Sequence, residues 1–102
     1  MSTEDKYDYK YDSIAVKNLS DIFEYIRFKL CNPKAAKDLF DNITEAVEQV
    51  RRFPESGETR YEDIRRILVD NYWLYYIPLH DIKTIYIVKL THATQKYENE
   101  KF

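Results

Sequence analysis

Apolar side chains recur at helical spacing in two consecutive stretches of the chain. From Ser13 to Leu30 they lie three or four residues apart, as on the buried face of an amphipathic helix. Asn32 and Pro33 suit the cap and the first position of a second helix, which we expect to stop by Phe53 because the following proline disfavours helix there. The predicted stripes are Leu19, Ile22, Phe23, Ile26 and Leu30 in the first helix, and Ala36, Leu39, Phe40, Ile43, Val47 and Val50 in the second.

Three later segments are rich in Ile, Val, Tyr and Trp, as is typical of β-strands. They cover residues 64–69, 72–77 and 84–90, whereas the polar stretch 54–63 predicts a loop. Residues 6–12 carry a tyrosine at every second position, which predicts an edge strand or a tail. The order strand, helix, helix, strand, strand, strand predicts an α+β domain in which a helical hairpin covers one face of a mostly antiparallel sheet.

The segment IRRILVDNYWLYYI, residues 64–77, predicts a β-hairpin that turns at Asp70 and Asn71. This register places apolar side chains and one arginine on each face, so either face could be the one that the helices cover. The other face is then covered by loops or a subunit, or it is a partner surface; we favour the partner surface. One face holds Arg65, Ile67, Val69, Tyr72, Leu74 and Tyr76, and the other holds Ile64, Arg66, Leu68, Trp73, Tyr75 and Ile77.

Length and net charge limit the number of domains and the kinds of partner that this chain can have. The 102 residues suit a single domain, residues 1–102, with residues 1–6 and 98–102 expected to be frayed tails. The formal net charge of −2 disfavours nucleic-acid binding through phosphate contacts alone, since such binding needs several uncompensated cations. Any nucleic-acid contact is therefore expected to be local.

Motifs for cofactors, metals and membranes are missing from the sequence. One glycine cannot build a phosphate-binding loop, and one cysteine with two scattered histidines does not match a zinc site. Cys31 has no partner for an internal disulfide, and the acidic, polar start does not resemble a signal peptide. With no apolar run near the about 20 residues that span a bilayer, we expect a cytoplasmic protein without cofactor or metal.

Three stretches together resemble the RelE/ParE superfamily of bacterial type II toxins: NPKAAKDLFDNITEAVEQVRRFPESG, IRRILVDNYWLYYI and IYIVKLTHATQ. The shared marks are the Asn-Pro-x-x-Ala helix start, the Phe-Pro-x-x-Gly turn, an arginine that opens a strand at Arg65, the Asn-Tyr-x-x-x-Tyr strand and a late histidine. The resemblance implies a toxin that a cognate antitoxin neutralises, as a dimer or a toxin-antitoxin hetero-oligomer. It implies one of two targets, mRNA on the ribosome or DNA gyrase, and it favours the face with Tyr72, Leu74 and Tyr76 as the buried one.

The ribonuclease branch of the superfamily implies a set of catalytic cations that this chain retains only in part. Its paired basic positions fall on Ile64 and Arg66, and its third-strand arginine falls on Trp73. Cleavage of RNA by its own 2′-hydroxyl needs a base, an acid and cations for the phosphorane. The catalytic candidates are Arg66 to stabilise charge, His92 to transfer protons and Tyr97 as a displaced tyrosine. Because most of the catalytic set is missing, we lean slightly away from efficient RNA cleavage.

The remaining candidates are binding residues. Trp73 and Tyr75 could stack a base or meet the antitoxin, and Arg60 and Arg65 could contact the target. The structural alternatives are that Arg65 anchors backbone at the rim of the core and that the late histidine bonds backbone at a strand end. A degenerate toxin that serves only as an interaction module also fits these residues.

Overall fold

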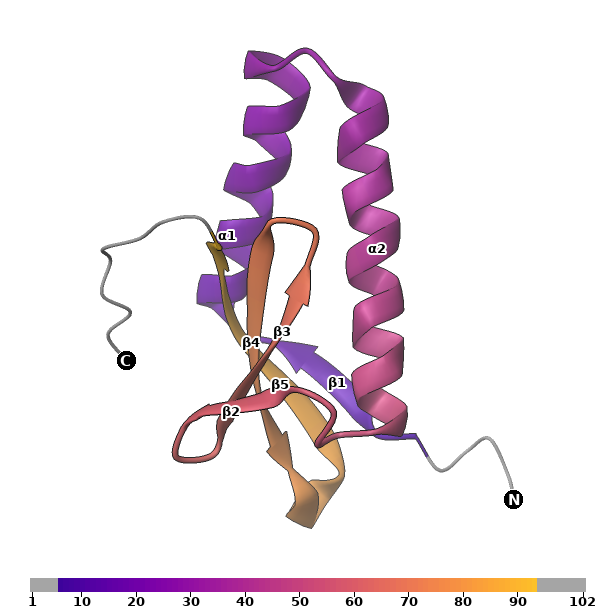
Figure 1. Ribbon diagram of the computed structural model, residues 1–102, viewed down its shortest axis with the longest axis vertical. Helices are drawn as coiled ribbons and strands as arrows, with labels where there is room; N and C mark the ends of the chain where they lie inside the picture. Colours follow the sequence, from indigo (N-terminus) through magenta and orange to yellow (C-terminus); the bar gives the residue numbers. More distant parts are fainter. Residues whose placement is uncertain (1–5, 94–102) are drawn as a thin grey trace.

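The computed structural model describes residues 6–93, which form a five-stranded sheet with two helices on one face (Figure 1). The elements are β1 (Asp8–Tyr11), α1 (Ser13–Glu24), a π-helical turn (Tyr25–Lys29), α2 (Pro33–Arg52), β2 (Glu58–Tyr61), β3 (Ile64–Val69), β4 (Tyr72–Leu79), a short 3-10 turn (His80–Ile82) and β5 (Thr84–His92). This arrangement confirms the predicted α+β class. The expected frayed ends, apart from Lys6, lie outside the described residues.

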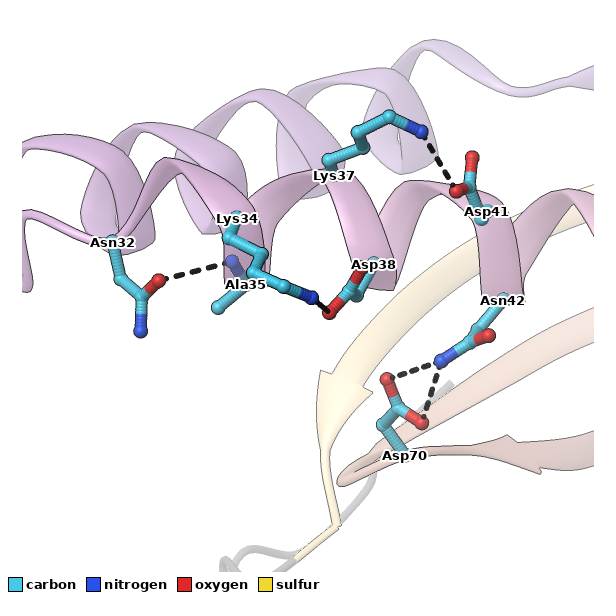
Figure 2. Close-up of polar contacts among 8 residues, drawn as sticks. All are labelled: Asn32, Lys34, Ala35, Lys37, Asp38, Asp41, Asn42 and Asp70. Carbon is cyan, nitrogen blue, oxygen red and sulfur yellow. Dashed lines mark hydrogen bonds and ion pairs between the residues drawn. The ribbon is translucent and has the colours of Figure 1, made fainter.

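Local capping signals place both ends of α2 as predicted. The side chain of Asn32 accepts a hydrogen bond from the backbone of Ala35 at 3.1 Å (Figure 2), and the helix ends before Phe53. Farther along, Asn42 of α2 donates to both carboxylate oxygens of Asp70 at 3.1 Å, so the helix is tied to the β3–β4 turn.

The predicted apolar stripes are wrong at two positions. Leu30 is 54% exposed and Phe40 is 57% exposed. The π turn closes with a hydrogen bond from the backbone of Leu30 to that of Tyr25, five residues back, and this extra residue rotates Leu30 out of the stripe. The ring of Phe40 lies 6.2 Å from that of Phe23, measured between centroids. The other predicted stripe positions face the core at least in part.

The sheet has the strand order β1-β5-β4-β3-β2. The edge strand β1 runs parallel to β5, and the other neighbours are antiparallel. Strand β2 replaces part of the loop expected over residues 54–63. All four of its side chains are exposed, so it lacks the apolar alternation that marks a half-buried strand.

The β3–β4 hairpin has the predicted register, and Asp70 in its turn adopts a φ of 56°. The face with Leu74 and Tyr76 is the buried one, as expected, and a register shift between Tyr75 and Tyr76 bends the pairing with β5. The core consists of Ala15, Ile26, Ala36, Leu39, Ile43, Val47, Val50, Val69, Leu74, Tyr76, Ile85, Ile87 and Leu90.

Candidate functional site

A row of polar and aromatic side chains crosses four neighbouring strands on the face of the sheet opposite the helices. Glu58 of β2 pairs with Arg66 of β3, Arg66 with Tyr75 of β4, and Tyr75 with Lys89 of β5. Residues directly opposite each other in neighbouring strands point to the same face. We call this surface, together with Trp73 in the adjoining row, the open-face cluster.

Arg66 is the centre of the open-face cluster. Its guanidinium carbon lies 3.7 Å from the centroid of the Trp73 ring, its Nε lies 2.5 Å from a Glu58 carboxylate oxygen, and its Nη1 lies 3.4 Å from the Tyr75 hydroxyl. Partial burial acts to lower the pKa of Arg66, but the hydrogen bonds to Glu58 and Tyr75 and the Glu58 charge outweigh it and raise the pKa. Arg66 is therefore a permanent cation that is already neutralised by a carboxylate.

Aromatic side chains form the floor beside this cation. Tyr75 is fully buried although it lies outside the helix-side core, and the ammonium of Lys89 lies 5.2 Å from the centroid of its ring. Leu68, opposite Trp73 in the adjoining row, is 53% exposed. Tyr75 is therefore not available to stack a base, which the sequence suggests as one of its roles. Trp73 and Leu68 supply the accessible apolar area beside the cations Arg66 and Lys89, and this combination suits protein contacts.

On the other face of the hairpin, Tyr76 and Arg65 form hydrogen bonds with the loop that precedes β2 and positions Glu58. The buried hydroxyl of Tyr76 accepts a hydrogen bond from the Gly57 N–H at 2.8 Å and donates one to the Pro54 carbonyl at 3.0 Å. Arg65 donates to the Gly57 carbonyl at 2.7 Å, so it takes the backbone-anchoring place considered as its alternative role. A Cβ on Gly57 would lie 2.6 Å from the Tyr76 hydroxyl, which explains the glycine there.

The remaining predicted site residues are His92, Arg60 and Tyr97. His92 pairs with Tyr72 on the helix-side face, with 5.0 Å between ring centroids, and lines a cleft of about 400 Å³ beside Ile22 and Tyr25 of the first helical segment. Arg60 is an exposed residue of the short edge strand β2. Tyr97 lies outside the described residues.

Sequence reasoning missed Glu58 and Lys89. Glu58 lies in a stretch that was expected to be a loop, and Lys89 lies within an otherwise apolar strand. The alternation of Glu58 and Arg60 with Thr59 and Tyr61 is the one local signal for β2.

The comparisons with known proteins agree with this architecture. The family model for the ParE toxin of type II toxin-antitoxin systems, parDE, matches residues 9–97. The chain belongs to the ParE toxin family. Among curated proteins, no sequence matches.

Solved structures share the fold of this ParE-family chain. The chromosomal ParDE toxin-antitoxin system from P. aeruginosa superposes with a TM-score of 0.70 at 16% identity, covering 85% of this chain and 96% of that one. The RelBE2 toxin-antitoxin complex of Mycobacterium tuberculosis gives 0.61 at 18% identity, covering 85% and 98%. The isolated RelE toxin of E. coli gives 0.58 at 17% identity, covering 89% and 88%.

The ParE-family chain presents only part of a ribonuclease set on its open face. Alternation along β3 puts Ile64 on the same face as Arg66, and Trp73 stacks on Arg66. One of these three positions is therefore basic. Residues 6–93 contain no group of three or more potential metal-ligating side chains, and neither of their helices combines the length and apolar content needed to cross a bilayer.

Proposed function

We propose that this ParE-family protein arrests bacterial growth by binding its target through the open-face cluster, and that a cognate antitoxin neutralises it in the cytoplasm. The observation that carries the proposal is the state of Arg66, whose charge is matched by Glu58 at 2.5 Å. Cations that stabilise a phosphorane must be available to the phosphate. A phosphate would have to compete with the Glu58 carboxylate for the Arg66 guanidinium.

The position of His92 supports the same proposal. A general acid or base must come within hydrogen-bond reach of the proton that it transfers. His92 lies with Tyr72 on the helix side of the sheet, whereas Arg66 lies on the open face. A binding toxin needs no such pair, and DNA gyrase is the target that the resemblance to the non-nuclease branch implies.

The second candidate is cleavage of mRNA on the ribosome, and it would use the same pair. If a bound phosphate separated the two side chains, the Glu58 carboxylate would serve as a base and Arg66 as the charge-stabilising group. The two candidates therefore differ in whether the same residues contact a protein or a reacting phosphate.

The experiment compares wild type, Arg66→Ala and the control Arg52→Ala, which removes an exposed arginine at the end of α2. Induction of wild type and of the control should stop growth with intact mRNA, stalled replication and DNA breaks, and co-expression of the protein encoded next to the gene should restore growth. Arg66→Ala should lose toxicity while circular dichroism shows a folded protein. Cuts at ribosome-occupied codons that vanish in Arg66→Ala would instead establish the ribonuclease, and unimpeded growth with soluble wild-type protein would exclude a toxin.

A further inference from the structure

The free end of the helical hairpin is a second surface, separate from the open-face cluster. We call residues 25–41 the hairpin tip; they comprise the π turn, the connection to α2 and the first turns of α2. Figure 1 shows that this end of the hairpin extends beyond the β3–β4 turn. Four of its large apolar side chains are exposed, by 54% at Tyr25, 67% at Phe28, 54% at Leu30 and 57% at Phe40.

A groove between the two helices runs through the hairpin tip. The rings of Phe23 and Phe40 lie 6.2 Å apart and, with Ala36 and Pro33, line an open hollow of about 380 Å³. An apolar groove between helices suits the apolar side of an amphipathic helix. The hollow can therefore take apolar side chains of a partner protein.

The hairpin tip is basic although the whole chain has a net charge of −2. Between residues 25 and 37 there are four basic residues and no acidic one: Arg27, Lys29, Lys34 and Lys37. The two lysines of α2 pair with Asp38 and Asp41 at 3.0 Å each (Figure 2). Within residues 6–93, Arg27 and Lys29 have no ion-pair partner. A second copy of the chain would bring the same charge to this surface, so the charge favours an acidic occupant.

The π turn is an independent sign that this surface is specialised. Its extra residue closes the hydrogen bond from Leu30 back to Tyr25 at 3.1 Å and turns Phe28 and Leu30 away from the buried stripe. Such π insertions are rare and occur frequently at functional sites. Here the insertion places two apolar side chains beside the unpaired cations Arg27 and Lys29.

We propose that the hairpin tip docks an acidic, amphipathic segment of the cognate antitoxin. Its apolar side fills the groove beside Phe40 and covers Phe28, and its carboxylates face Arg27 and Lys29. The inference rests on the antitoxin partnership of the proposed function. Because the tip is separate from the open-face cluster, a toxin with an altered tip stays toxic but escapes neutralisation.

The experiment uses the full chain and the purified protein encoded next to its gene. The double variant Phe28→Ala with Lys29→Glu changes only exposed side chains, and its matched control is Phe53→Ala with Lys10→Glu, in which Phe53 is 63% exposed. We expect the tip variant to weaken the antitoxin Kd by about tenfold or more, and the control to stay within about twofold. The wild-type Kd should also weaken as salt rises, because the contact is partly charged. The melting temperature of each variant reports its folding.

Growth assays complete the test. The tip variant should arrest growth like wild type, and co-expressed antitoxin should rescue wild type and the control but not the tip variant. Equal Kd values for tip variant and wild type overturn the inference. A tip variant that binds antitoxin normally but loses toxicity assigns the tip to the target instead, and wild-type binding to phosphatidylglycerol vesicles that the tip variant loses assigns it to a membrane surface. Failure of wild type to bind the neighbouring protein at all would refute the antitoxin partnership itself.

Discussion

Removal of one hydroxyl group, in Tyr76→Phe, tests how the loop before β2 is held. The Tyr76 side chain is fully buried, and its hydroxyl bonds both the Gly57 N–H and the Pro54 carbonyl. These two contacts connect β4 to the loop that positions Glu58 beside Arg66. The substitution keeps the ring, so its effect reports the hydrogen bonds and not the packing.

The expected loss follows from the burial of the groups left behind. A typical intramolecular hydrogen bond contributes about 0.5–1.5 kcal/mol net, and a buried donor left unsatisfied costs about 1–3 kcal/mol. Gly57 is itself buried, so its N–H has no simple replacement by water. We therefore expect Tyr76→Phe to lower the free energy of unfolding by about 2–3 kcal/mol, which for a domain of this size is a fall in Tm of about 10 °C or more.

Urea denaturation followed by circular dichroism measures this loss. The control is Tyr9→Phe, since the Tyr9 side chain is 47% exposed and its substitution should change stability by less than about 0.5 kcal/mol. If the two variants unfold at the same urea concentration, the Tyr76 hydroxyl does not hold the loop and the reasoning is refuted.

Two further predictions concern the helices and the tyrosines. Ile43→Ala should destabilise the fold by about 2–5 kcal/mol because Ile43 is buried. Phe40→Ala, at a half-exposed position of the hairpin tip, should cost less than about 1 kcal/mol. Urea denaturation measures both losses, and a larger loss from Phe40→Ala than from Ile43→Ala would place the Phe40 ring in the core. Burial, and then the neighbouring Tyr9, raises the pKa of Tyr11 from 10.0 to about 12. Ionisation then favours the unfolded chain, so stability should be full below pH 10 and fall as pH rises toward 12; a Tyr11→Phe protein whose Tm falls equally over that range would contradict this assignment.

The sequence by itself determined the features that depend on neighbouring residues. Asn32 and Pro33 set the start of α2 because capping is a local hydrogen-bonding event. The turn at Asp70 and Asn71 set the register of the β3–β4 hairpin, because a two-residue turn leaves one pairing of the flanking strands. Element order and alternation then sufficed for the fold class, and the short motifs, such as the Asn-Pro-x-x-Ala helix start, carried the family resemblance.

Only the tertiary structure decided which side chains surround Arg66. Its partner Glu58 lies on β2, a strand without a buried apolar face that would mark it in the sequence. Lys89 lies on β5, which is separated from β3 by β4. Alternation alone does not say how far the helices extend past the sheet, so the exposure of Phe40 depended on the packed arrangement. These features arise from contacts between residues distant in the chain, whose geometry is set by strand order and register and not by local sequence.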